Sequence, residues 1–517
     1  MTSPTTAPPP VAPGRERRSD AGAPVAPPSP GVARRRGRPR LTPARVVLCC
    51  AAAAVLSTFV APTPSYDPWA WIIWGRELAG LSDLGFSTAS ATGWKPLPVL
   101  ITTPFSLLGT ELGPAAWVAL VRTAALLALV LAARLAHRAA GRGAAIAAVA
   151  LLLASPQALE LVTGGASEAI VLLALLYGIE RHLDGRRGAA LAAGIVACLA
   201  RPETAALVLP YAVWVWRTGA IPRWRIAAGI GVLPLLWIGG DWLGTGRPFL
   251  TFGHATSSIE PNRVQDAAVP GLELLAGTTA LVALVVVALA VAGIVDSVRR
   301  REPVGTALGV ALGTLALPLA VLTELGYPGV PRYLSAPAAL AGVLAAIALA
   351  RGVRAMLPRP HGRAAVALGA AGLAALVALA GAPGLRSSWA QYTGRVRLDR
   401  SLPEAIAAAG GRTTLLSCGR PVIRPAYLAT DLAYRLDVPM RDVNSGGEAP
   451  AVVLFPRKGV SWRGYTQSWG PWLALARIAR TRDWEVYQLR DAWTRPCAAA
   501  AAGNLGPVIP DPVPAPG

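Results

Sequence analysis

Long apolar runs alternate with short arginine-rich segments from residue 44 to Pro383 of this chain. Runs of about 20 apolar residues are long enough to cross a bilayer as a helix. We predict eleven spans, at about 44–61, 115–136, 144–160, 168–180, 188–200, 203–216, 226–243, 271–295, 304–323, 333–350 and 364–383. The apolar segment Val99–Gly109 is too short to cross, so we expect it to be re-entrant or interfacial.

The arginine clusters fix the predicted orientation, because basic loops stay in the cytoplasm. Residues 1–43 form a Pro- and Arg-rich tail that we expect to be disordered and cytoplasmic, ending in the basic block Ala33–Arg40. The remaining clusters then fall on the same side if 188–216 makes two short spans. A single helix there would place the cluster Arg217–Arg225 outside, so we expect two.

The composition changes after Pro383, where charged residues return. Three short apolar runs resemble strands: Thr413–Cys418, Ala451–Pro456 and Trp484–Leu489. Two stretches between them resemble helices: Pro403–Gly410 and Pro471–Arg480. This alternation predicts a small extracytoplasmic α/β domain over 384–497. Residues 498–517 form an Ala/Pro/Gly-rich tail that we expect to be disordered.

Cys418 and Cys497 are the two cysteines of this outer region. In an oxidising compartment a disulfide between them is expected, and two free thiols are the alternative. Cys49, Cys50 and Cys198 lie in apolar spans, where a packing role is typical.

The stretch Ser65–Pro98 follows the first span and begins an outer loop over 62–114. Asp67, Trp71, Trp74 and Leu78 recur at helical spacing, so they share one face of a helix. A helix with tryptophan on its apolar side tends to lie flat at the water–lipid boundary. We therefore expect an interfacial helix that presents a carboxylate; the alternative is a loop that only anchors two spans.

Composition supports a membrane protein rather than a soluble one, since 53% of the 517 residues are hydrophobic. The formal charge is +21, and lysine occurs only at Lys95 and Lys458. Because the basic residues lie between apolar runs, they indicate topology and not a nucleic-acid partner. The chain has no CxxC pair and no His/Cys cluster with metal-binding spacing.

The polar residues of the predicted outer face are the candidates for chemistry. Two carboxylates, Asp67 and Glu168, are the candidate catalytic groups. The candidate binding groups for substrate or phosphate are Lys95, Arg201, Arg263, Arg332, Tyr333, His254 and Trp71. Carboxylates set against cations can deprotonate a hydroxyl and hold a phosphate leaving group. The structural alternatives are helix capping by the acids, contacts of Arg201 and Arg332 with lipid headgroups, and a solvated His254.

Several short motifs, in order, resemble the GT-C superfamily of membrane glycosyltransferases. They are the early Asp67, Trp94–Pro98 (WKPLP), Arg134–Arg138 (RLAHR), Gly164–Leu176 with Glu168, Arg201–Glu203 (RPE) and Pro331–Pro337 (PRYLSAP). RPE and PRYLSAP are similar to elements of bacterial mannosyltransferase-like members, and Tyr66–Leu78 resembles actinobacterial members. The chain departs from the superfamily at Lys95–Pro98, where members often have His-Pro-Pro-Leu, and at Glu168, where Asp is commoner.

The resemblance covers roughly residues 44–350. Together with the predicted spans, it implies a GT-C-like, α-helical polytopic domain over 44–383 in the plasma membrane. It implies inverting transfer of a mannose- or arabinose-like sugar from a polyprenyl-phosphate donor to an envelope glycan, lipid or protein, with Asp67 as general base. Use of a divalent metal stays open. Two other functions remain: a lipid-linked-sugar flippase, which needs polar groups at mid-membrane depth, and a non-catalytic envelope-assembly protein.

Overall fold

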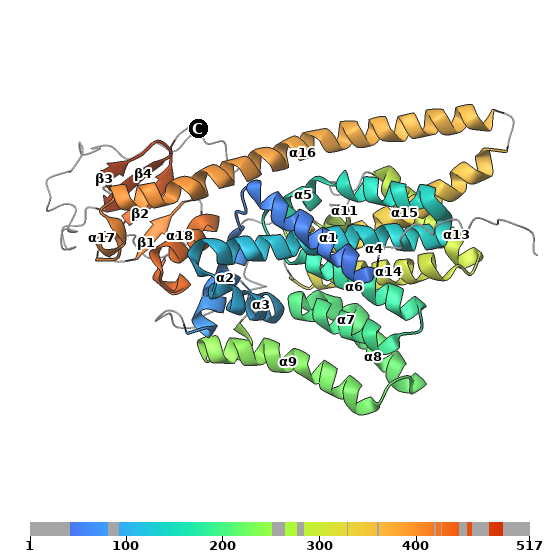
Figure 1. Cartoon of the computed structure of the whole chain (residues 1–517), viewed down its shortest axis with the longest axis horizontal. Helices are drawn as coiled ribbons and strands as arrows, with labels where there is room; N and C mark the ends of the chain where they lie inside the picture. The colour runs from blue at the N-terminus through green and yellow to red at the C-terminus, as the bar shows by residue number, and fades with distance from the viewer. Residues whose placement is uncertain are drawn as a thin grey trace, which may run out of the picture.

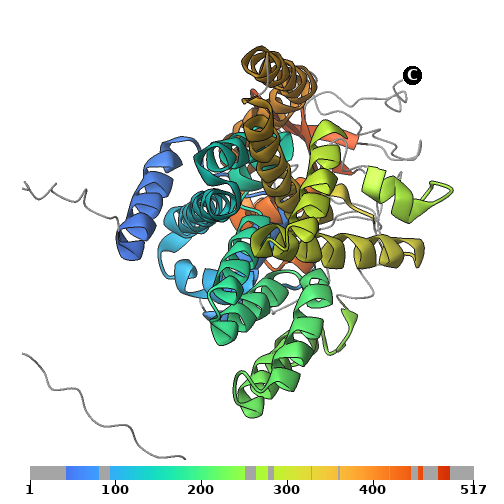
Figure 2. The same cartoon turned by 90° about the vertical axis from the view of Figure 1, so that its right-hand side faces the viewer.

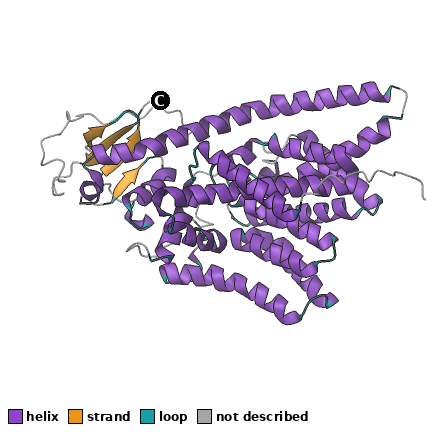
Figure 3. Cartoon of the chain, viewed as in Figure 1, coloured by secondary structure: helices purple, strands orange, loops and turns teal. Residues whose placement is uncertain are grey.

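A computed structural model describes residues 42–80, 93–250, 264–276, 284–327, 329–358, 361–417, 420–424, 426–443, 452–457 and 475–489. Helices form an elongated bundle, and a small sheet lies at one end of it (Figures 1 and 3). Most of both tails predicted to be disordered lies outside the described residues.

The first half of the bundle contains short helices at one end and two reversals of the chain. Its elements are α1 (Pro43–Leu56), η1 (Ser57–Phe59), α2 (Tyr66–Leu78), α3 (Pro96–Ser106), α4 (Gly109–Leu153), α5 (Pro156–Thr163) and α6 (Glu168–Leu183). Within α4 the dihedrals leave the helical region at Ala140 and Gly141, and Gly141 has a φ of 76° that favours glycine. The chain returns from there, because the Trp117 Nε1–H near the start of α4 donates to the Gly165 carbonyl at 2.8 Å.

The expected pair of helices between 188 and 216 is present. It consists of α7 (Arg187–Ala200), η2 (Pro202–Thr204) and α8 (Ala205–Thr218). Arg201 between them is extended, with φ −151° and ψ 113°. A residue that precedes proline is disfavoured in the helical region, so Pro202 explains the break. The chain therefore has two helices there, as the arginine pattern requires.

The second half of the bundle packs α15 against α4 at its centre. Its elements are α9 (Arg223–Thr245), α11 (Pro270–Ala276), α13 (Leu284–Arg299), α14 (Pro303–Glu324), η3 (Pro331–Leu334) and α15 (Ser335–Met356). One buried cluster of the bundle joins side chains of α4, α6 and α15, Leu135, Leu176 and Leu344 among them. Figure 2 views the bundle from its end, with the green α8 and α9 projecting at one side.

Four helices among the described residues are long and apolar enough to cross a membrane: Gly109–Leu153, Arg223–Thr245, Pro303–Glu324 and Arg332–Met356. These apolar helices indicate a multi-pass membrane protein. The number of eleven spans and the side that each end faces remain predictions.

The boundary expected at Pro383 lies inside a helix. Helix α16 runs from Gly362 to Ala408 with Pro383 inside it, and Figure 1 shows it reaching from the bundle to the sheet. Proline usually disrupts a helix interior, but tertiary packing supplies most helical stability in proteins. The far end of α16 buries Leu398, Leu402 and Ala405 against the C-terminal region. The change from apolar to polar sequence therefore falls within one helix and not at a linker.

The C-terminal region carries a four-stranded sheet in the order β1-β2-β4-β3. The elements are α17 (Gly411–Ser417), β1 (Pro421–Ile423), η4 (Ala426–Leu428), α18 (Ala429–Leu436), η5 (Met440–Asp442), β2 (Val452–Pro456), β3 (Leu475–Arg480) and β4 (Trp484–Leu489). Strand β1 is parallel to β2, and the other two pairs are antiparallel. The strands expected within Ala451–Pro456 and at Trp484–Leu489 are both present.

Two assignments in this region are wrong. Thr413–Ser417 is helical, because it lies in α17. This helix is held against α18 by Arg412, whose Nε–H donates to the Leu436 carbonyl at the end of α18 at 2.5 Å. The described part of Pro471–Arg480 is strand β3, which forms a hairpin with β4 through the short turn Thr481–Asp483. Pairing across a hairpin outweighs the helix propensity of its Leu and Ala residues, because strand formation depends on cross-strand context.

Helix α2 is not the expected interfacial helix. Every residue from Pro68 to Glu77 is buried, because α3 and α4 cover part of the helix and the C-terminal region covers another part. The Trp69 ring lies 4.6 Å from the ring of Tyr434 in α18. Arg76 stacks over the same ring at 4.6 Å and pairs with Asp437 at 3.1 Å. The tryptophans therefore pack inside the protein and not against lipid. The disulfide candidates Cys418 and Cys497 lie outside the described residues.

The close approach of α2 to α3 depends on Gly75. A Cβ there would lie 2.5 Å from Thr102 Oγ1 and 2.7 Å from the Thr102 carbonyl carbon. We expect Gly75→Ala to destabilise the protein by about 1–3 kcal/mol, as overpacking does. The measurement is thermal unfolding of detergent-solubilised protein. Gly231→Ala in α9, where a Cβ meets nothing within 4 Å, is the matched control and should not lower the melting temperature. Equal effects of the two changes would contradict the prediction.

Candidate functional site

Asp67 is held between two cations that come from distant parts of the chain. It lies in the first turn of α2, Lys95 immediately precedes α3, and Arg332 lies in η3. Asp67 Oδ2 is 3.1 Å from Arg332 NH2 and 3.9 Å from Lys95 Nζ. Lys95 also lies over the face of the buried Trp71 ring, 4.7 Å from its centre. The ammonium is therefore fixed by an ion pair on one side and a cation–π contact on the other.

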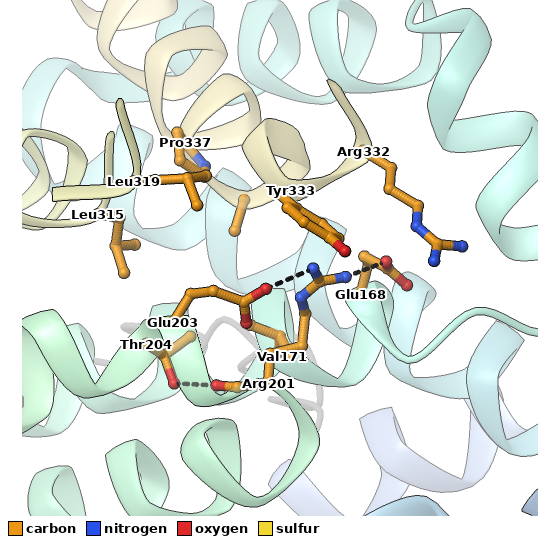
Figure 4. Close-up of a pocket in the computed structure, with 11 residues that line it drawn as sticks. Glu168, Val171, Arg201, Glu203, Thr204, Leu315, Leu319, Arg332, Tyr333 and Pro337 are labelled. Atoms are coloured by element: carbon orange, nitrogen blue, oxygen red, sulfur yellow. Dashed lines mark hydrogen bonds and ion pairs between the residues drawn. The ribbon is translucent and has the colours of Figure 1, made fainter. Parts of the chain in front are cut away.

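Arg201 forms a second, more buried cluster beside the first. Its NH1 donates to Glu168 Oε1 at the start of α6, and its NH2 donates to Glu203 Oε1 in η2 at 2.9 Å. The guanidinium carbon lies 4.5 Å from the centre of the Tyr333 ring. Figure 4 shows Arg201 between the two carboxylates with Tyr333 beside it. The extended backbone before Pro202 turns this side chain out of the helical register of α7 and toward both acids.

Glu203 and Tyr327 belong to the cluster but were not predicted as site residues. The Tyr327 hydroxyl donates to Glu203 Oε1 at 3.2 Å, and its ring lies 5.7 Å from that of Tyr333. The sequence held a signal for Glu203, because an acid two residues after Arg201 across a proline turn faces the same side. Tyr327 precedes the PRYLSAP element, but nothing local pairs it with Glu203.

A small pocket lies beside these residues. The polar side of its lining consists of Glu168, Arg201, Glu203, Thr204, Arg332 and Tyr333. The apolar side comes from α6, α14 and α15 and consists of Val171, Leu315, Leu319, Ala336 and Pro337. Arg332 is the link, because it lines the pocket and also binds Asp67. The two carboxylates and three cations predicted from separate loops thus meet at one place.

The charges of this site set the protonation of Asp67 and Lys95. Burial alone would raise the pKa of Asp67, but the charges of Arg332, Lys95 and Arg201 outweigh it and hold that pKa below its usual value. Burial and the charge of Arg201 lower the pKa of Lys95 to about 8, although Asp67 and Glu168 act in the opposite direction. At neutral pH Asp67 is ionised, and Lys95 is a cation that loses its proton readily.

Two predicted binding residues, His254 and Arg263, lie outside the described residues. Within the described part of the chain, no group of three or more His, Cys, Asp or Glu side chains gathers to hold a metal ion. The carboxylates near the pocket are occupied by arginine and lysine instead. The described residues therefore do not fit a metal centre, and the chemistry below uses side chains alone.

Comparisons with known proteins give similarities at the level of structure. No protein-family model matches this chain. No curated protein matches it either. The chain is similar to ArnT from Cupriavidus metallidurans bound to undecaprenyl phosphate, with 18% identity, a TM-score of 0.46, and coverage of 88% of this chain and 100% of that chain.

It is also similar to the oligosaccharyltransferase of Archaeoglobus fulgidus. The complex with Zn and sulfate has 14% identity, a TM-score of 0.44, and coverage of 80% of this chain and 68% of that one. The same organism's AglB with an inhibitory peptide and a dolichol-phosphate has 12% identity, a TM-score of 0.39, and coverage of 80% and 69%. These neighbours are GT-C membrane glycosyltransferases. They belong to the superfamily that the sequence motifs resemble. Since the identities and TM-scores are low, the residue roles below rest on the geometry of this chain.

The low pKa of Lys95 can be measured without a substrate. Because lysine occurs only at positions 95 and 458, the pH dependence of reductive methylation can be followed for Lys95 by peptide mass spectrometry. We expect a midpoint near pH 8. Asp67→Asn removes a charge that raises this pKa, so the midpoint should fall; Arg332→Gln removes one that lowers it, so the midpoint should rise. Shifts of the same sign in both variants would contradict the assigned geometry.

Proposed function

We propose that this protein is an inverting membrane glycosyltransferase. It transfers a mannose- or arabinose-like sugar from a polyprenyl-phosphate donor to an envelope glycan, lipid or protein acceptor on the outer face of the plasma membrane. The observation that carries the proposal is the Asp67 carboxylate bound by Lys95 and Arg332 at the edge of the pocket. A base and a phosphate-binding pair of cations are the two components that this reaction needs in contact.

Lys95 and Arg332 are better placed than Arg201 to bind the donor phosphate. Both end nitrogens of Arg201 are engaged by buried carboxylates, so a phosphate would have to displace Glu168 or Glu203. Among the described residues, the ion pair that Lys95 and Arg332 each make is the one to Asp67. The Arg332 side chain is also 42% exposed, against 7% for Arg201. A phosphate can therefore share these two cations without breaking the Arg201 cluster.

Donor binding would also prepare Asp67 to act as a base. In the resting site its two cations hold its pKa low. A phosphate that shares those cations brings a negative charge close to Asp67, and like charges raise the pKa of a carboxyl group. The carboxylate therefore gains proton affinity only when the donor is present.

The transfer itself then balances as a single displacement. Asp67 takes the proton of the acceptor hydroxyl, and the hydroxyl oxygen forms a bond to the anomeric carbon. The bond from that carbon to the phosphate oxygen breaks, and polyprenyl phosphate leaves with the electron pair, held by Lys95 and Arg332. Base catalysis supplies about 10²–10⁴-fold, so stabilisation of the leaving phosphate is the larger contribution.

The positions of the ion-paired acids of α6 favour an enzyme over a flippase. A carrier needs its polar groups near the middle of the membrane. In α6 the ion-paired acids lie at the two ends instead, with Glu168 at its first residue and Glu180 in its last turn. The cluster at Glu168 is the one that adjoins the pocket.

Replacement of Asp67 by asparagine tests the base. Asp67→Asn keeps the shape of the side chain and removes its proton affinity, so we expect the transfer rate to fall by about 10²–10⁴-fold. The measurement is transfer of radiolabelled sugar from a polyprenyl-phosphate donor by purified protein. Asp296→Asn is the matched control, because Asp296 also binds two arginines, Arg300 and Arg351, away from the pocket. Unchanged transfer by Asp67→Asn would exclude the base assignment.

The pH dependence of transfer should report Lys95. As the pH rises through about 8, the free protein loses the Lys95 charge and binds the anionic donor less well, so kcat/KM for the donor should fall. Arg stays protonated, so Lys95→Arg should move this fall to higher pH by more than one unit. The measurement is the pH profile of both proteins with the same donor. A fall at the same pH in both would assign it to another group.

A further inference from the structure

The Oε2 atom of Glu203 takes no part in the reaction described so far. Its Oε1 accepts hydrogen bonds from Arg201 and Tyr327. Its Oε2 is buried and has no hydrogen-bond partner among the described residues. Buried polar atoms are almost always paired, and an unpaired oxygen of a charged group is especially costly. A hydrogen-bond donor on a bound ligand would satisfy this second oxygen.

The pocket beside Glu203 has one polar side and one apolar side. Glu168, Arg201 and Glu203 form a row of charged groups, whereas Tyr333, Leu315 and Leu319 supply apolar surface (Figure 4). A sugar ring has the matching surfaces, with hydroxyl groups around its edge and C–H groups on its faces.

We propose that Glu203 is a specificity-determining residue, and that its Oε2 accepts a hydrogen bond from a hydroxyl or amino group of the donor sugar. This inference rests on the proposed function. Arg332 lines the pocket and holds the phosphate end of the donor, so the sugar extends from there toward Glu203. An ionised carboxylate only accepts hydrogen bonds, so this position selects neutral or amino sugars and repels the carboxylate of a uronic acid.

The isoprenoid chain of the donor is the rival occupant, since Leu315 and Leu319 also line the pocket. A hydrocarbon chain next to Glu203 would leave Oε2 without a partner. A sugar hydroxyl would satisfy it, and a site built to bind a hydroxyl discriminates strongly against ligands that lack it.

The first test compares a donor with its sugar-free carrier. Glu203→Gln should lower kcat/KM about 10- to 100-fold for undecaprenyl-phosphate mannose or undecaprenyl-phosphate arabinose, whichever the wild type accepts. Inhibition by undecaprenyl phosphate alone should change less than twofold. Glu180→Gln removes a buried, arginine-paired carboxylate in the last turn of α6, away from the pocket, and should leave both values unchanged. Equal weakening of donor and carrier would assign this part of the pocket to the lipid and overturn the proposal.

The second test excludes a general disturbance of Arg201 in the variant. Single-deoxy analogues of the accepted donor should include one that the wild type transfers at least tenfold less efficiently, and this penalty should disappear in Glu203→Gln. The same penalty in both proteins would overturn the proposal. If the wild type transfers the donor and Glu203→Gln does so equally well, only the role of Glu203 fails. If the wild type transfers from neither donor and binds neither, the proposed function and this inference fail together.

Discussion

The ion pairs of the buried Arg201 impose a constraint on which the arrangement of the site depends. A guanidinium removed from water costs several kcal/mol unless nearby anions compensate its charge. Arg201 has two such anions, Glu168 and Glu203, and the Tyr333 ring contributes its π face. To supply them, the start of α6, the turn between α7 and α8, and η3 must meet at one point. Pro202 makes this possible, because it forces an extended residue where a continuous helix would direct Arg201 elsewhere.

The second ion cluster differs from the first in its exposure and therefore in what it can do. Arg201 has both end nitrogens occupied and is almost inaccessible, so it is suited to holding other groups in place. Arg332 and Lys95 share one carboxylate, and Arg332 is partly exposed. The second cluster can accept a further anion more easily, since the partly exposed Arg332 can pair with it while still holding Asp67. A rigid pair of acids beside an exchangeable pair of cations is the preorganisation that group transfer requires.

Local rules in the sequence predicted the features that local chemistry determines. The arginine clusters predicted two helices between 188 and 216, and the short apolar run Trp484–Leu489 predicted β4. The features that were missed depend on contacts between distant residues. Helix α16 continues through Pro383 because its far end packs on the C-terminal region, and β3 is a strand because β4 lies beside it. For the site, the residue types on the outer loops were predictable, but the pairing of Glu203 with Tyr327 joins residues 124 positions apart.

The burial of α2 gives the C-terminal region a role at the site, although none of the described side chains of that region lines the pocket. The Thr430 hydroxyl, at the start of α18, donates to the Tyr66 carbonyl at 3.0 Å, one residue before Asp67. On the other side, the Ser65 N–H donates to the Gly164 carbonyl at 2.8 Å, four residues before Glu168. The backbone before Asp67 is thus tied both to α18 and to the segment that leads into α6. Because Asp67 and Glu168 directly follow these two segments, the distance between the two acids depends on the docking of the C-terminal region. Helix α16 connects that region to the bundle.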